Sequence, residues 1–405
     1  MMEDYSRSGK NRAHPEHDAA RGRFRIFKVN AARLGAVLKK LDWRLIGMML
    51  IVKSVFYLYG TQAYQALTDS GVRNFTGWLA LWNRWDAIHF LNVAQNGYQA
   101  AGNSRFEIVN YPLFPWLTRV VALAVGNYVI GGLIVAGLAS IAAGLLLQKL
   151  VLLDYSRAIA RRAVWFMFIF PTSYVLHVPY SESVLIALAL GSFLAARNGR
   201  WPLAGVLGAL ACLSRLNGLV LAPSLLIEAG CQWRIDRRFR WSWLWIGFTG
   251  LGIVAYLLLN YHVSGDPFIF MKYAREHWNQ VLSWPWIGIS EKITGAFQPA
   301  GSNDQSWLMI EVQGLIFIAL GFVGSVWAWI KLRPSYAMWM TGNWLLFTST
   351  TFLISVPRFT VVMFPLYMMF SRLSGNRLLY GLITVWSLLY LALFTGLYVE
   401  GHWVS

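Results

Sequence analysis

The sequence predicts an all-α polytopic membrane protein. Of its 405 residues, 57% are hydrophobic, 16% are aromatic and only 13% are charged, whereas about 25% of the residues in a soluble domain carry charge. The chain also contains 21 Trp, many of them near the ends of apolar runs, where the ring favours the membrane–water boundary. Only helices or closed barrels satisfy the backbone within lipid, and the long apolar runs indicate helices.

The first 42 residues differ in composition from the rest of the chain. They are polar and rich in charged side chains, which is typical of a disordered tail, with a surface helix over about 24–40 as its one expected element. The first apolar run begins near Trp43, after a charged segment too long for the n-region of a signal peptide, and it is long enough to span. We therefore expect a basic cytosolic tail over 1–42 and one transmembrane domain over 43–405.

Apolar runs within this domain predict about eleven transmembrane helices. Several runs are shorter than the ~20 residues that a span usually needs, so those helices are expected to tilt or stop short. The run over 111–125 is either a further short span or a helix on the outer surface. The predicted spans are 44–66, 128–153, 162–179, 182–197, 201–214, 217–231, 241–261, 307–330, 336–355, 357–371 and 377–399.

Charge orients these spans. Most of the 35 Lys and Arg residues lie in the tail and in the short connections "DYSRAIARR", "ARNGR", "RIDRRFR", "KLRPS" and "SRLSGNR", which places these segments in the cytosol. The net charge of +17 is therefore read as orientation charge, and no nucleic-acid partner is predicted. The two long connections, 67–127 and 262–306, fall on the outer side. Because function concentrates on long connections, we expect the active face there, with amphipathic helices in the first outer loop.

Asp86 is the first candidate for chemistry. It stands in "LWNRWDAIHFLNVAQNGY", where residues 78–94 have the spacing of an amphipathic surface helix. Asp86, His89 and Phe90 are neighbours on such a helix, at i, i+3 and i+4. An acid at the membrane boundary often marks a functional site. The alternative is a water-exposed acid on the polar side of the helix.

Three further charged residues lie near the predicted outer ends of spans. Arg215 in "LSRLNGL" and Arg358 in "SVPRFT" are costly at that depth unless they pair with an anion, and arginine grips phosphate oxygens through two nitrogens. They suit either a lipid phosphate or, by snorkelling, the lipid headgroups. Glu182 in "VPYSESV" has a second interpretation, because Ser181 and Glu182 together are typical of a helix N-terminus.

No metal site is predicted. Cys212 and Cys231 lack metal-ligand or disulfide-framework spacing, and we expect both to be packed apolar residues. His89 and His177 lack further ligands at a diagnostic spacing. The mixed-charge stretch "MKYAREHW" in the second outer segment is expected to be a solvated helix face, with closure over a donor as the alternative.

Five blocks of the sequence, in order, resemble the phosphatidylinositol-glycan class V family over about residues 44–371. The resemblance implies a GT-C glycosyltransferase, a polytopic enzyme that takes a sugar, usually mannose, from a polyprenyl phosphate on the non-cytosolic face. It further implies that Asp86 is the catalytic base and that Arg215 and Arg358 bind the donor phosphate. Tyr111 departs from the pattern, where members commonly have Phe. The blocks are "WDAIHFLNVAQNGY", "NYPLFPWLTR", "PYSESV", "LSRLNGL" and "VPRFTVVMFPLY".

The prediction is therefore an inverting, polyprenyl-phosphate-dependent glycosyltransferase, with mannose as the expected sugar. Its expected partners are the lipid-linked sugar donor, a lipid or glycan acceptor and membrane lipids, with no metal or other cofactor. Short loops favour a bacterial member in the cytoplasmic membrane, with the N-terminus in the cytosol and the site on the outer face. The residues expected to contact substrate are Trp85, His89, Tyr111, Tyr180, Glu182 and Asn217.

Three alternatives remain open at this point. A transporter or flippase of lipid-linked sugars usually has two similar halves with broken helices at matching positions, and no such repeat is visible. A non-catalytic partner of another glycosyltransferase would share the fold without the activity. An acyltransferase would need a catalytic histidine, whose usual context is not convincing here.

Overall fold

The computed structural model describes residues 42–297 and 307–404. Contacts divide the chain into two units, Met1–Ile46 and Gly47–Ser405, and the site described below lies within the second unit. The described residues form helices and turns, with one isolated antiparallel bridge between Leu282 and Thr350. The all-α prediction is thus confirmed for this part of the chain. The predicted surface helix over 24–40 lies outside the described residues.

The helices differ widely in length, and short 3₁₀ turns and one π turn (η5) separate or extend several of them. In chain order they are α2 Trp43–Thr68, α3 Phe75–Leu81, α4 Asp86–Asn96, η1 Asn103–Val109, α5 Leu113–Val125, α6 Tyr128–Val151, α7 Arg157–Ile169, η2 Ser173–Leu176, α8 Glu182–Arg197, α9 Trp201–Ser214, η3 Leu216–Val220, α10 Leu221–Asp236, η4 Trp241–Phe248, α11 Thr249–Ser264, α12 Ile269–Trp278, α13 Pro285–Phe297, η5 Leu308–Val312, α15 Gln313–Lys331, α16 Pro334–Thr348, α17 Val356–Phe359, η6 Thr360–Val362, α18 Pro365–Leu373 and α19 Arg377–Glu400.

Five helical stretches of the described chain are long and apolar enough to cross a membrane, judged by length and composition. The bent pair η1 and α5, which turns by 112°, makes a sixth if it counts as one span, so the ambiguous run over 111–125 belongs to a broken element. The chain is accordingly an integral membrane protein. The five stretches are Trp43–Thr68, Tyr128–Val151, Trp241–Ser264, Leu308–Lys331 and Arg377–Glu400.

Helix length alone does not reproduce the expected eleven spans. The other six predicted spans contain α7, α8, α9, α10, α16 and α18, each only 9 to 16 residues long. Turns or short helices divide several of these runs or separate one run from the next. Pro179 lies in the turn before α8, and Pro357 lies in the four-residue helix α17. Proline lacks a backbone donor and restricts the residue before it. Tyr180 and Arg215 lie in turns and Arg358 lies in α17, so these breaks place the polar residues of the site.

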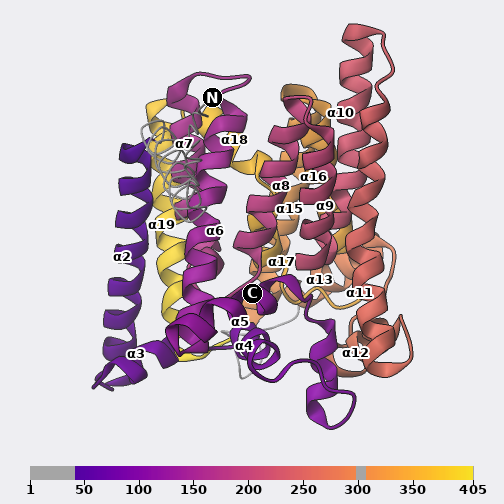
Figure 1. The fold of residues 1–405 in the computed structure, drawn as a ribbon. Coiled ribbons are helices and arrows are strands. Elements are labelled where there is room, and N and C mark those ends of the chain that lie inside the picture. Colours follow the sequence, from indigo (N-terminus) through magenta and orange to yellow (C-terminus); the bar gives the residue numbers. More distant parts are fainter. Residues whose placement is uncertain (1–41, 298–306, 405) are drawn as a thin grey trace, which may run out of the picture. The chain divides into compact units, whose positions relative to one another are not determined.

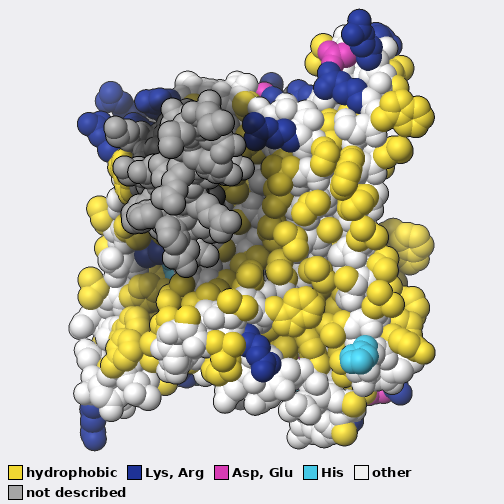
Figure 2. Space-filling model, viewed as in Figure 1, with side chains coloured by type: hydrophobic (Ala, Val, Ile, Leu, Met, Phe, Trp, Pro, Cys, Tyr) yellow, Lys and Arg dark blue, Asp and Glu magenta, His cyan; other side chains and the backbone are white. Residues whose placement is uncertain are grey.

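Helices α8 and α9 run antiparallel and bring Glu182 and Arg215 to the same end of the helix pair. Helix α8 runs from Glu182 to Arg197, and α9 returns from Trp201 to Ser214, directly before Arg215. In Figure 1, α3, α4, α5 and α12 lie at the lower end of the long helices. On the face shown in Figure 2, hydrophobic side chains cover the helices between their ends, and most of the Lys and Arg side chains gather at the upper end.

Close packing of small residues fixes α9 against η4 and α11. A Cβ atom at Gly252 would lie 2.0 Å from the carbonyl oxygen of Ala209, and one at Gly205 would lie 2.1 Å from that of Trp245. Backbones that approach so closely exclude any side chain, as is common where helices associate in membranes. This contact holds the end of α9, and with it Arg215, in a defined place.

Candidate active site

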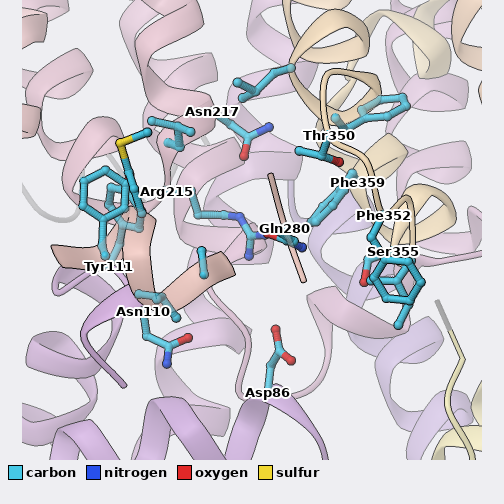
Figure 3. Close-up of a pocket in the computed structure, with 18 of the residues that line it drawn as sticks. Asp86, Asn110, Tyr111, Arg215, Asn217, Gln280, Thr350, Phe352, Ser355 and Phe359 are labelled. Carbon is cyan, nitrogen blue, oxygen red and sulfur yellow. The ribbon is translucent and has the colours of Figure 1, made fainter. Parts of the chain in front are cut away.

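A cavity of about 710 Å³ lies where the two long connections, 67–127 and 262–306, meet the turns that end several helices. Figure 3 shows the carboxylate of Asp86 pointing into it from α4 and the side chain of Arg215 reaching toward its centre, beside Gln280. Much of the remaining wall is apolar. The apolar lining includes Phe270, Leu282, Phe347, Phe352, Leu353 and Phe359.

A break in the connection over 67–127 places Asp86. The predicted single helix over 78–94 is wrong, because α3 ends at Leu81 and α4 begins at Asp86. Trp85 between them has φ of 53° and ψ of −126°, a conformation that strains a bulky residue. The hydroxyl of Tyr398 lies 3.1 Å from the carbonyl oxygen of Trp82 and stabilises the turn. Asp86 is therefore the first residue of α4, where the helix dipole favours a negative charge.

Four charged side chains, here called the charged cluster, alternate in sign from Asp86 to Arg215. Arg358 Nη1 lies 2.6 Å from Asp86 Oδ2, and Arg358 Nε lies 2.5 Å from Glu182 Oε1. The same Glu182 oxygen accepts a hydrogen bond from Arg215 Nη1 at 3.0 Å, and this nitrogen also lies 3.0 Å from Ser181 Oγ. The cluster of Asp86, Arg358, Glu182 and Arg215 carries no net charge when all four groups are ionised.

The members of the charged cluster differ in their access to the cavity. The side chain of Asp86 is 30% exposed and that of Arg215 is 16% exposed, whereas Arg358 is 4% and Glu182 is 0% exposed. Asp86 and Arg215 line the cavity wall, and Arg358 and Glu182 lie behind it. The guanidinium of Arg358 stacks 4.3 Å from the ring centroid of Tyr180. Of the two arginines expected to bind phosphate, only Arg215 therefore faces the space where a ligand fits.

The surroundings of Asp86 keep its carboxylate ionised. Burial raises its pKa. The charge and hydrogen bond of Arg358, together with the charges of Arg215 and His89, lower the pKa by more than burial raises it. The net effect is a pKa below the ordinary value of 3.8. Asp86 is thus an anion throughout the neutral range, with free lone pairs available to accept a proton.

His89 has a partner that the sequence did not reveal. Its Nδ1 lies 3.0 Å from Glu107 Oε1, and Asn110 Nδ2 donates to Glu107 Oε2 at 3.0 Å. The hydrogen bond to Glu107 raises the pKa of His89, burial opposes this, and the charges of Glu107 and Asp86 raise it further. His89 lies outside the cavity wall, whereas Asn110 is part of it. No local spacing pairs residues 89 and 107, which is why Glu107 was not singled out.

The other residues expected to contact substrate divide into two groups. Tyr111 and Asn217 line the cavity; the ring of Tyr111 stacks on Tyr256 at 4.1 Å, and Asn217 Nδ2 donates to the Asn343 amide oxygen at 2.7 Å. Trp85 is not part of the wall, and its indole donates to the carbonyl oxygen of His402 at 3.0 Å. Tyr180, whose ring stacks on Arg358, and Glu182, which accepts from Arg215, are not part of the wall either.

The connection over 262–306 contributes wall residues that sequence reasoning missed. The backbone bridge between Leu282 and Thr350 ties this segment to the turn before α17, and both residues of the bridge line the cavity. Gln280 also lines the cavity, and its side chain lies beside that of Arg215 (Figure 3). Lys272 and Arg275 of the "MKYAREHW" stretch also line it, so this helix is not simply a solvated face. Within the described residues, no group of three or more His, Cys, Asp or Glu side chains is placed to hold a metal ion.

Comparison with known proteins identifies a similarity in structure only. No family model and no curated protein matches the chain. The solved apo structure of the Archaeoglobus fulgidus oligosaccharyltransferase is 10% identical with a TM-score of 0.43, over 88% of this chain and 56% of that chain. Its complex with an inhibitory peptide and a dolichol-phosphate, there named AglB, is 11% identical with a TM-score of 0.41, over 87% and 55%. This chain therefore spans about half the length of the oligosaccharyltransferase that it matches.

Proposed function

We propose that this chain is an inverting glycosyltransferase of the GT-C class, which moves a sugar from a lipid phosphate to an acceptor hydroxyl. The observation that carries the proposal is that Asp86 and Arg215 both line one largely apolar cavity. An ionised carboxylate is a proton acceptor, and a guanidinium is a ligand for phosphate. Transfer from a lipid phosphate needs both groups within one site.

Asp86 acts as the base in this proposal. The acceptor hydroxyl attacks C1 of the sugar, its oxygen forms the new bond, and its proton passes to the Asp86 carboxylate. The bond between C1 and the phosphate oxygen breaks, and its electron pair leaves with the lipid phosphate. Attack from the face opposite the phosphate inverts the configuration at C1. A base placed in this way contributes on the order of 10²- to 10⁴-fold to the rate.

Arg215 stabilises the leaving group. The phosphate gains negative charge as the bond breaks, and a fixed guanidinium in a poorly hydrated wall stabilises developing charge most effectively. Arg358 was expected to bind the donor phosphate, but in this proposal it orients the base. Its guanidinium is held between Asp86 and Glu182. We propose that no metal ion is needed for the step.

The apolar wall suits a lipid-borne donor. Phe270, Leu282, Phe347 and Phe352 border the cavity, and a polyprenyl chain buries favourably against such side chains. A polyprenyl-phosphate mannose as donor rests on the resemblance to the phosphatidylinositol-glycan class V family. The short loops support a bacterial membrane as the protein's location. The outer face as the side of the site is supported by the resemblance and by the basic connection between α8 and α9, which lies at the ends of these helices away from Glu182 and Arg215.

The deciding experiment uses purified protein, labelled polyprenyl-phosphate mannose and a panel of lipid and glycan acceptors. Wild-type protein should form a glycoside by itself, and Asp86→Asn should lower the rate by at least 10²-fold while donor binding persists. Asp69→Asn is the matched control, because Asp69 is an exposed acid of the same outer segment and lies outside the cavity wall. Unchanged transfer by Asp86→Asn would remove Asp86 from its role.

The same assay separates the competing functions. A transporter or flippase would move the labelled lipid across vesicle membranes without forming a glycoside. A non-catalytic partner would form product only when a second glycosyltransferase is added. Either result would overturn the proposal of a self-sufficient enzyme.

A further inference from the structure

We infer that Glu182 is a positioning residue that limits how tightly the site grips the donor phosphate before the reaction. The inference rests on the proposed function and deepens it, because it concerns the arginine that would bind the phosphate. Glu182 does not line the cavity, so it acts through Arg215 and Arg358 and not by touching substrate.

The Glu182 carboxylate is shared between two guanidiniums. Its Oε1 accepts from Arg215 Nη1 at 3.0 Å and from Arg358 Nε at 2.5 Å. The side chain is fully buried, and Oε2 has no hydrogen-bond partner among the described residues. Both arginines thus compete for a single oxygen of a carboxylate that water does not reach. The contact sets the spacing of the two guanidiniums and fixes the direction in which each points.

Glu182 neutralises part of the charge that an incoming phosphate meets. With Glu182 ionised, the charged cluster is neutral, and a phosphate meets an Arg215 guanidinium whose charge Glu182 already partly compensates. Without that carboxylate the cluster would carry one positive charge, and Arg215 would be free to bind the phosphate of the intact donor. The grip on the donor before reaction would then be stronger.

A weaker initial grip favours turnover. Interactions that are equally strong in the bound substrate and in the transition state lower KM without raising kcat. The donor phosphate carries one negative charge, which grows as the C1–O bond breaks, so a partly compensated Arg215 responds mainly to the charge that develops. The lipid phosphate product also dissociates more readily, because Glu182 competes with it for the Arg215 guanidinium.

The molecule contains a second buried carboxylate with the same kind of partners, which serves as a control. Glu228 in α10 is fully buried and forms two hydrogen bonds with Arg333, at 2.6 and 2.8 Å, while Arg197 Nε lies 3.8 Å away. Arg197 ends α8, whose first residue is Glu182, so the two networks are separated by a 16-residue helix, about 24 Å. Glu228→Gln removes the same charge from a similar network far from the cavity.

The test compares Glu182→Gln with Glu228→Gln in the full-length protein, using labelled polyprenyl-phosphate mannose as donor and polyprenyl phosphate as product inhibitor. For Glu182→Gln we expect the donor KM and the inhibition constant of polyprenyl phosphate to fall about tenfold, with kcat falling at least as much. For Glu228→Gln both constants should stay within about twofold of wild type, whatever the loss of thermal stability. A purely structural role of Glu182 would lower kcat with an unchanged or higher KM, and that result overturns the inference.

Two further arms keep the test decisive. If Glu182→Gln does not fold, Glu182→Asp is used instead, because its shorter side chain moves the carboxylate away from both arginines. The donor KM and the inhibition constant of polyprenyl phosphate should then fall by a smaller factor. Unchanged or higher constants contradict the inference. Direct binding of polyprenyl phosphate to the unreacted proteins is independent of transfer. If the protein transfers no sugar but the variant binds polyprenyl phosphate more tightly than wild type, the proposed function is contradicted. The effect of Glu182 on phosphate binding is then still supported.

Discussion

Arg358 Nη1 donates to Asp86 Oδ2 across 2.6 Å, although the two residues are 272 positions apart in the chain. The contact joins the start of α4 in the first outer segment to α17, the short helix that interrupts an apolar run before α18. A buried guanidinium at this distance fixes both the orientation and the ionisation of the carboxylate proposed as the base. The first prediction tests that electrostatic effect.

Replacing Arg358 with Gln should move the acidic limb of the pH–rate profile to higher pH. Burial raises the pKa of Asp86 and Arg358 is the main group that lowers it, so loss of the cation leaves burial largely unopposed. The variant's kcat/KM should therefore begin to fall at a higher pH than that of wild type as the solution is acidified. Arg358→Lys, which keeps the charge, should show a smaller shift. An identical limb in all three proteins would contradict the assignment of Asp86 as the titrating base.

Replacing Arg215 with Met should lower kcat/KM for the donor. A hydrogen bond to a charged group contributes about 1.5–3 kcal/mol, which corresponds to a kcat/KM lowered by roughly 10- to 150-fold. Arg215→Lys should recover part of the loss, because the charge remains while the paired donor geometry is lost. The measurement is kcat/KM for the donor at saturating acceptor. If kcat/KM of Arg215→Met equals that of wild type, Arg215 is not the phosphate ligand.

The His89–Glu107 pair should make stability depend on pH. Because the folded pKa of His89 is raised, its contribution is fully present below its unfolded pKa of about 6.5. The contribution is lost as pH rises through the folded value. The Tm of wild type should therefore fall over that window, and Glu107→Gln should flatten the dependence. The check is thermal unfolding in detergent at a series of pH values; equal slopes in both proteins would exclude the pair as the cause.

Replacing Gly252 with Ala should destabilise the packing of α9 on α11. The new Cβ would meet the Ala209 carbonyl oxygen at 2.0 Å, so the two backbones must separate and the Arg215 turn must shift with α9. Gly250→Ala on the same helix is the control, since a Cβ there meets nothing within 4 Å and alanine favours a helix by up to about 1 kcal/mol. We expect lower Tm and lower transfer for Gly252→Ala only. Similar losses in both variants would mean that close packing is not responsible.

Transfer should persist in the presence of a chelator. The proposed step assigns the phosphate charge to Arg215 and the proton to Asp86, so EDTA should leave the initial rate within about twofold of the untreated rate. The control is restoration with excess Mg²⁺ or Mn²⁺, which should add no activity. A chelator-sensitive rate that either ion restores would overturn the metal-free proposal.

Several features of the fold follow from local sequence alone. Apolar length and low charge predict membrane helices because a buried backbone must satisfy its hydrogen bonds within each segment. The number of membrane-spanning helices is harder to predict from sequence, because an apolar run has the same composition whether it forms one helix or two short helices around a turn. The break before Asp86 is a similar case: nothing in a Trp residue signals the left-handed φ that Trp85 adopts.

Within the site, the sequence identified unusual residues better than their partners. Asp86, Arg215 and Arg358 attract notice because a charge in apolar surroundings needs a reason. Glu182 in turn was equally well explained as part of a helix N-terminus. That it lies between both arginines, that Arg358 is held behind the wall, and that His89 pairs with Glu107 depend on segments brought together from distant parts of the chain.

The sequence by itself determined that this chain is helical, that it resides in a membrane and which charged residues stand out against the apolar background. These properties depend on composition and on neighbours along the chain. Only the tertiary structure decided which charges pair and which of them reach the cavity. Pairing depends on distances of about 3 Å between segments as many as 272 positions apart, and local sequence carries no record of those distances.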